Sequence, residues 1–159
     1  PFVKINCAAL PAELLESDFG IASDVWRVTS FTELRRDGLE VERWNRLHPT
    51  EERRLSFVEQ ALAGRSGPLV AATDYMRTFA DQIRPFVPKE RVYRVLGTDG
   101  FGRSDSRAKL RHFFEVNRYF VAVAALKALA EQGEGKAKAA ADALTKYRID
   151  PGKPDPTTV

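Results

Sequence analysis

The chain has 159 residues, of which 43% are hydrophobic and 30% are charged, and its 25 basic and 22 acidic residues give a net charge of +3. This length and composition predict one soluble globular domain, and no apolar run approaches a bilayer span, so no membrane partner is expected. Acidic and basic residues are interleaved nearly everywhere, which indicates a solvated surface and disfavours nucleic acid as a partner.

The chain opens with alternating apolar and polar residues, which predict a strand over Phe2–Asn6. A helix should follow, with Pro11 in its first turn and Gly20 at its end, because proline suits a helix start and glycine a helix stop. The second strand is expected at Asp24–Thr29, which is rich in β-branched and aromatic residues.

A long helical pattern then covers residues 31–48, with a break expected near Gly38. Ser30 and Glu33 have the spacing of a capping box, in which each side chain bonds the backbone amide of the other at a helix start. Pro49 should end the helix, because the residue before a proline is pushed out of the helical region.

A second capping box, Ser56 with Glu59, predicts a short helix that ends at Gly64. The wholly apolar run Pro68–Ala72 predicts a strand covered on both faces, which is typical of a parallel sheet. The next helix and strand are expected at 75–84 and 92–96.

Beyond residue 102 the pattern predicts helices only, at 106–115, 118–131 and 136–147. The middle one is apolar on nearly all sides and should be buried. The tail, residues 150–159, holds three prolines and predicts an extended surface arm. Strands that alternate with helices predict a three-layer α/β fold with right-handed crossovers.

The two histidines, His48 and His112, lie in no recognisable nucleophile motif, so we expect them to be structural or solvated. One cysteine, Cys7, and two distant histidines match no metal-ligand spacing, and a lone cysteine fits a reducing, cytoplasmic location. Trp26 and Trp44 are expected in the core. The helical spacing of Tyr75, Met76 and Phe79 predicts core packing or a subunit contact.

The Gly-rich stretch after the fourth strand is the main candidate site, as an interface or anion-contact loop. It is neither GxGxxG nor a P-loop, and two alternatives stay open: backbone amides that face an anion, or a tight turn. Asp99 and Asp105 bracket Arg103, which favours a turn held by ion pairs. The basic cluster Arg103, Arg107, Lys109 and Arg111 should be solvated, with an acidic partner as an alternative. The candidate residues are Gly97, Asp99, Gly100, Arg103, Ser104 and Arg107.

Three stretches carry a family resemblance: DVWRVTSFTELRRDGLEVERWNRLHPTEE (24–52), VAATDYMRTFADQIRPFVP (70–88) and YRVLGTDGFGRSDSRAKLRHFFEV (93–116). With FVAVAALKALA and the closing IDPGKPDP, they resemble in order the C-terminal domain of the homodimeric-type pyruvate dehydrogenase family, over roughly 14–159. The resemblance implies a fold like the transketolase C-terminal domain, a mostly parallel sheet flanked by helices.

The resemblance also implies a parent enzyme that decarboxylates pyruvate and passes the acetyl group to a lipoyl carrier, with thiamine diphosphate and Mg²⁺ held by two preceding domains. The family's Gly-Asp-Gly motif and its activating acidic residue are not in this sequence. No catalytic, cofactor-binding or metal-binding residue is therefore expected, and the isolated chain should be inactive. The implied role is packing of the parent's other domains, with self-association as a dimer; docking of the acyltransferase core is the alternative.

The N-terminal stretch PFVKINCAALPAELLES (1–17) resembles instead a segment of bacterial enhancer-binding AAA+ ATPases. The chain is therefore predicted to be a chimera whose junction lies between Leu10 and Ser17, and, since it begins at Pro1, a piece of something longer. This segment carries no P-loop or Walker B acid, so nucleotide hydrolysis is not expected, and the interleaved charge disfavours a DNA-associated regulator.

Overall fold

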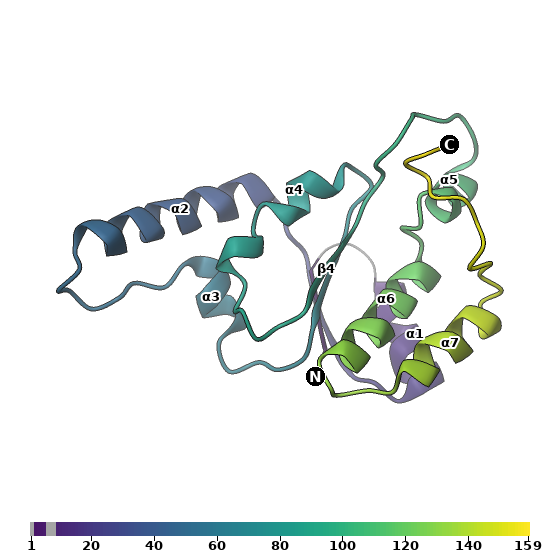
Figure 1. Cartoon of the computed structure of the whole chain (residues 1–159), viewed down its shortest axis with the longest axis horizontal. Helices are drawn as coiled ribbons and strands as arrows, with labels where there is room; N and C mark the ends of the chain where they lie inside the picture. Colours follow the sequence, from purple (N-terminus) through teal and green to yellow (C-terminus); the bar gives the residue numbers. More distant parts are fainter. Residues whose placement is uncertain (1, 6–8) are drawn as a thin grey trace.

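Four parallel strands form the centre of the molecule, in the order β2-β1-β3-β4 (Figure 1). The computed structural model describes residues 2–5 and 9–159, with side chains from residue 11 onward. The strands are β1 Phe2–Ile5, β2 Ser23–Trp26, β3 Leu69–Ala72 and β4 Tyr93–Leu96. The predicted α/β fold with a parallel sheet is confirmed, and residue 6, the expected end of the first strand, lies outside the described residues.

Helices cover both faces of this sheet. They are α1 Ala9–Phe19, α2 Phe31–Leu47, α3 Phe57–Leu62, α4 Arg77–Asp81, the 3₁₀ helix η1 Arg84–Phe86, α5 Arg107–Phe113, α6 Arg118–Glu131 and α7 Ala137–Lys146. In Figure 1, α2, α3 and α4 lie on one side of the strands, and α1, α6 and α7 lie on the other. Among the described residues, no helix has both the length and the apolar character needed to cross a bilayer.

The central strand β3 divides the interior into two cores. All four of its residues are buried, with Leu69 and Ala71 in the core under α3 and η1, and Val70 and Ala72 in the core under α1, α6 and α7. Successive side chains of a strand point to opposite faces, so an unbroken apolar run supplies both cores at once. This confirms the prediction of a strand covered on both faces.

The two predicted capping boxes differ in the structure. At α3 the box is complete: Glu59 N donates to Ser56 Oγ at 3.3 Å, and Ser56 N donates to Glu59 Oε2 at 2.8 Å. Burial favours a raised pKa of Glu59, but the hydrogen bonds from Arg53 and Ser56 outweigh it and hold the pKa below its usual value. At α2 only the Ser30 half forms, with Glu33 N as donor at 3.2 Å, while the Glu33 carboxylate pairs with an arginine one turn on.

Helix α2 is continuous where a break was expected. Gly38 lies inside it, buried against the Phe86 ring, and a Cβ at this position would lie 2.5 Å from ring carbons. A glycine is needed at this position because α2 and η1 approach closely there, so the predicted break at Gly38 is wrong. The second strand also ends earlier than expected, at Trp26, and the helix expected over 75–84 is divided into α4 and η1.

A polar joint connects α1 and α7, two of the helices on the right-hand side of the sheet in Figure 1. The Asp18 carboxylate at the end of α1 accepts a hydrogen bond from the Tyr147 hydroxyl at 2.8 Å and pairs with Lys146 Nζ at 2.8 Å. The hydrogen bonds from Lys146 and Tyr147 hold the pKa of Asp18 below its usual value. Burial raises the pKa of the Tyr147 hydroxyl, so it stays protonated and remains the donor.

We predict that Gly38→Ala destabilises the fold by about 1–2 kcal/mol, because overpacking against Phe86 outweighs the better helix propensity of alanine. The measurement is urea unfolding followed by circular dichroism. Gly102→Ala is the matched control, since nothing lies within 4 Å of a Cβ there. A stabilised Gly38→Ala variant contradicts the close contact.

We predict that Asp18→Asn lowers the stability of the fold at neutral pH. The variant should also lose less stability than the wild type when the pH is lowered. A carboxyl whose folded pKa lies below the unfolded value stabilises the fold above that unfolded value, and the stabilisation disappears as the pH falls through the folded pKa. The wild type should therefore lose more stability than the variant between about pH 5 and pH 2. The measurement is thermal unfolding of both proteins across this pH range. If the stability of the two proteins changes equally with pH, the contacts of Asp18 with Lys146 and Tyr147 do not stabilise the fold.

Candidate functional site

The loops that follow β3 and β4 meet at the carboxyl edge of the sheet, where ligands bind in many open α/β sheets. Thr98 N donates to Tyr75 O at 3.0 Å, and the Thr98 hydroxyl donates to Asp74 O at 3.2 Å. Gly97 lies where these loops touch, since a Cβ there would approach Tyr75 O and Arg77 N to 2.7 Å. The first candidate residue is thus a glycine required by close backbone contact.

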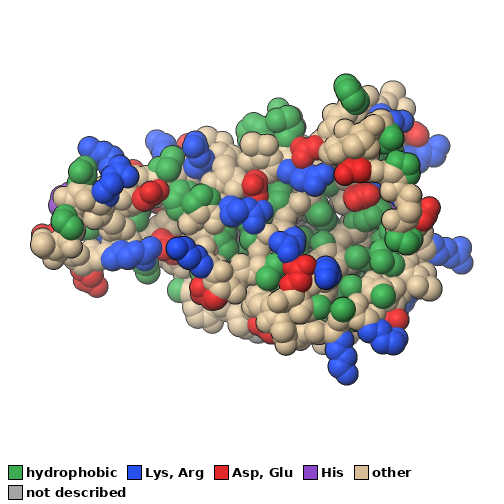
Figure 2. Space-filling model, viewed as in Figure 1, with side chains coloured by type: hydrophobic (Ala, Val, Ile, Leu, Met, Phe, Trp, Pro, Cys, Tyr) green, Lys and Arg blue, Asp and Glu red, His purple; other side chains and the backbone are tan. Residues whose placement is uncertain are grey.

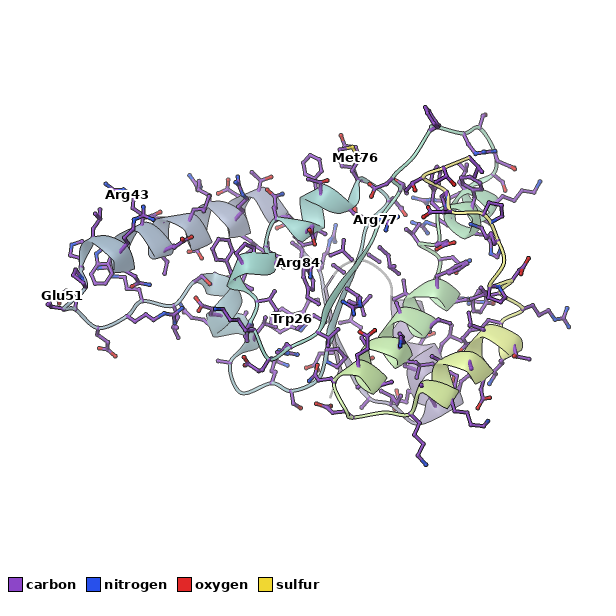
Figure 3. All side chains as sticks on the ribbon, viewed as in Figure 1. Trp26, Arg43, Glu51, Met76, Arg77 and Arg84 are labelled. Atoms are coloured by element: carbon purple, nitrogen blue, oxygen red, sulfur yellow. The ribbon has the colours of Figure 1, made fainter. Side chains whose placement is uncertain are left out.

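Asp99 connects the same two loops through Arg77. Its Oδ1 accepts from Arg77 N at 3.0 Å, and its Oδ2 lies 2.9 Å from Arg77 Nε in an ion pair (Figure 3 labels Arg77). Arg77 N belongs to the first residue of α4, whose N-cap Met76 offers no side-chain hydrogen bond. Asp99 therefore caps α4 from a loop 22 residues away in the sequence.

The C-terminal tail lies over the Gly-rich loop. Gly100 has φ +110°, and a Cβ there would collide with the carbonyl of Pro156, which is buried. Lys153 Nζ donates to Phe113 O at 2.7 Å and to Glu115 Oε1 at 3.2 Å. Figure 1 shows the tail returning to the region of α5. Residues 150–159 are called the strap from here on. Lys153 and Pro156 hold the strap over this loop, and its other residues are exposed, as expected of a surface arm.

The charged residues of the loop have partners other than those expected. Asp105 pairs with Lys109 at 3.5 Å, and the Arg103 guanidinium lies 4.2 Å from the centre of the Phe113 ring. Asp99 and Asp105 do take part in local ion pairs, as the sequence favours, but their partners are Arg77 and Lys109 rather than the intervening Arg103. Arg111 pairs with Asp74 at the end of β3.

Four of the six candidate residues are exposed, namely Gly100, Arg103, Ser104 and Arg107. Arg107 lines an open hollow of about 560 Å³ together with Arg103 and Phe101. Ser106 has the N-cap position of α5 but forms no side-chain cap bond, and its own amide donates to Asp105 Oδ1 at 2.7 Å. Use of this loop as an anion or protein contact stays a prediction.

His48 lies at the end of α2, away from the carboxyl edge, and His112 packs against an aromatic ring. His48 Nδ1 is 2.8 Å from Trp44 O, and its ring stacks on Trp44 with centroids 4.3 Å apart. Arg54 lies over the same Trp44 ring at 3.6 Å, at the far end of α2. Trp44 is therefore a stacking platform on the projecting helix, which corrects the core assignment, whereas Trp26 packs against a core as expected. His112 lies edge-on to Phe120.

Tyr75, Met76 and Phe79 are exposed by 58%, 45% and 40% of their surface. These values contradict core packing, which was one of the two roles predicted for them. The spacing signal was ambiguous because α4 is short and begins only at Arg77. Phe101, at the same edge, is 75% exposed, and no sequence pattern predicted it. Across the parts of the chain that the structure describes, no group of three or more His, Cys, Asp or Glu side chains could hold a metal ion.

Comparison with known proteins adds a family and a set of relatives. Residues 3–117 match the family described as the transketolase-like TK C-terminal domain. A pyruvate dehydrogenase E1 component of Pseudomonas aeruginosa is 61% identical over 145 residues, which cover 91% of this chain and 16% of the relative. Those of Cupriavidus necator and Escherichia coli K12 are 58% and 55% identical over 93% and 91% of this chain, each with 16% of its own length covered. The chain thus spans about a sixth of these relatives. The likeness of residues 1–17 to AAA+ ATPases is untouched by these matches and stays a prediction.

We predict that Lys153→Met loosens the strap. The variant removes the donor from two acceptors, Phe113 O and Glu115 Oε1. Since the lysine side chain is only 17% exposed, the loss should cost about 1.5–3 kcal/mol locally. Amide hydrogen exchange in residues 97–102 and 113–116 should then rise about tenfold or more. Lys127→Met is the control, because its pair with Glu131 is at 3.7 Å and 58% of the lysine is exposed. Equal exchange in both variants argues against a strap.

Proposed function

The chain belongs to the transketolase-like C-terminal domain family, and on that premise we propose that it is the C-terminal, non-catalytic packing domain of a thiamine diphosphate-dependent pyruvate dehydrogenase (acetyl-transferring). The carrying observation is the match itself: 61% identity over 145 residues that make up 16% of a pyruvate dehydrogenase E1 component. A domain that keeps its sequence so fully within a much longer relative is expected to keep its place in that architecture.

The carboxyl edge supports a structural role. Its charged side chains are largely occupied with one another, as in Asp99 with Arg77, Asp74 with Arg111 and Glu115 with Lys153. These pairs fix loops and the tail, and they leave few charged groups directed at a ligand. On this proposal thiamine diphosphate and Mg²⁺ are held elsewhere in the parent, which decarboxylates pyruvate in the cytoplasm and passes the acetyl group to a lipoyl carrier. The N-terminal 17 residues are proposed to be the foreign part of a chimera.

Docking of the acyltransferase core has weaker support. It depends on the basic cluster near α5, where Lys109 and Arg111 are ion-paired and Arg103 lies over an aromatic ring. Arg107 alone in this cluster has neither kind of contact among the described residues. A single exposed guanidinium is a small basis for docking, since exposed charge attraction is screened over about 10 Å at 0.1 M salt.

The proposal is tested by one assay of pyruvate decarboxylation with thiamine diphosphate and Mg²⁺. Three proteins are compared: this chain alone, the E. coli K12 relative, and that relative with its matching 145-residue region replaced by the one from this chain. We expect no turnover by the chain alone. We expect the hybrid to retain activity within about tenfold of the relative, because packing residues at 55% identity should largely conserve the contacts.

Turnover by the isolated chain refutes the non-catalytic role. A hybrid that folds, by circular dichroism and gel filtration, yet has no activity refutes the packing role. A further hybrid, joined at residue 18 of this chain so that residues 1–17 are left out, separates failure of the domain from failure of the predicted foreign segment.

A further inference from the structure

An open hollow of about 680 Å³ lies against β4, the outer strand of the sheet, and is named here the β4 hollow. Because β4 ends the order β2-β1-β3-β4, no strand among the described residues pairs with its outer side. The hollow is lined by β4, α2, α4 and η1, and its charged residues are Arg35, Arg77, Asp81, Arg84 and Arg94. Figure 2 shows basic side chains across the middle of this face, around the place that β4 has in Figure 1.

The outer side of β4 presents backbone groups to the hollow. Thr73 N donates to Leu96 O at 3.0 Å, so Leu96 directs its backbone groups toward β3. Alternate residues of a parallel strand bond to opposite sides, and Tyr93 and Val95 therefore face outward. In agreement with this, Tyr93 O accepts from Arg84 Nη1 at 3.1 Å. Backbone groups along a free strand edge can pair with a further strand.

Bases outnumber acids in the lining of the β4 hollow, which holds four arginines and one aspartate. Arg77 pairs with Asp99, and their side chains are 43% and 32% exposed. Arg94 pairs with Glu131, and their side chains are 46% and 30% exposed. Neither of these carboxylates is part of the lining. A partner that enters the hollow therefore meets the guanidinium side of both pairs.

Two further arginines can receive a carboxylate at little cost. Arg35 is exposed on α2 and, among the residues that the structure describes, it has no hydrogen bond, ion pair or ring contact. Arg84 pairs with Asp81, and both side chains are about half exposed, so this ion pair is weak and easily exchanged. If Arg84 turns to an incoming carboxylate, a backbone N–H of the partner can take its place at Tyr93 O.

We propose that the β4 hollow binds an extended acidic segment of a partner polypeptide, which adds a strand to the outer side of β4. The backbone of the segment pairs with Tyr93 and Val95, and its side chains alternate between the two faces of the sheet. Acidic side chains on the α4 face reach Arg35 and Arg84, and those on the other face reach Arg94. A phosphate-bearing ligand would satisfy the arginines and leave the strand unpaired, so a polypeptide fits both features. The inference goes beyond the packing role proposed above.

The test is fluorescence anisotropy of a labelled hexapeptide of alternating glutamate and valine, titrated with the whole chain at low salt, where charge attraction is screened least. We expect saturable binding that Arg35→Glu weakens about fivefold or more, because the reversal removes an attraction and adds a repulsion. Arg43→Glu is the matched control, since it makes the same change of charge at an exposed residue farther out on α2 (Figure 3). It should change the affinity by less than about twofold. Circular dichroism checks that both variants are folded.

Amide hydrogen exchange tests the added strand separately. With saturating peptide, exchange at Tyr93 and Val95 should slow about tenfold or more, whereas exchange at Arg94 and Leu96, which already face β3, should not change. The same peptide made from N-methyl amino acids keeps its carboxylates and loses its backbone donors. It should bind about tenfold more weakly than the unmodified peptide.

Absence of binding by the acidic hexapeptide overturns the inference, as does equal binding by the N-methylated peptide or equal weakening by Arg43→Glu. Inorganic polyphosphate that binds more tightly than the peptide, with the same dependence on Arg35, indicates a phosphate ligand and overturns the polypeptide occupant. Protection of Tyr93 and Val95 that rises with protein concentration in the absence of peptide indicates pairing between copies and overturns it as well. None of these measurements involves decarboxylation, so their outcome is independent of the packing role.

Discussion

Burial of β3 on both faces is the constraint from which the rest of the molecule follows. Four consecutive apolar residues, Leu69 to Ala72, leave this strand no solvated face, so helices must cover both sides of it. Its neighbours β1 and β4 run parallel to it, and parallel strands require crossover connections long enough to carry those helices. Since the faces are filled, polar chemistry is confined to the edges of the sheet.

At the carboxyl edge, the polar groups are used mainly to hold the chain together. Asp99 joins the loop after β4 to the first amide of α4, and Thr98 bonds the loop after β3 twice. The strap adds Lys153, whose ammonium satisfies two acceptors beside α5. An edge closed in this way is a stiff platform, which is consistent with the packing role proposed above.

Local signals in the sequence predicted much of this fold, and distant contacts decided the rest. The complete box of Ser56 and Glu59 and the buried run of β3 depend on neighbouring residues, and both were predicted. Helix α6 has the predicted bounds, because its cap, Asn117, is adjacent to an unbroken apolar stretch. Gly38 appeared to break a helix since the pattern holds no information about Phe86, which lies against it from 48 residues away.

The candidate site shows the same division. The glycines and aspartates of the loop after β4 were recognised as a turn held by ion pairs, but their partners were not, because Arg77 and Pro156 come from other parts of the chain. The Asp99 contact also bears on the exposure of Tyr75 and Met76. By capping the amide of Arg77 it sets the helix start there, so Tyr75 and Met76 precede α4 instead of joining its buried face. Closure of the carboxyl edge and the exposure of Tyr75 and Met76 beside it therefore depend on the same hydrogen bond, from Arg77 N to Asp99 Oδ1.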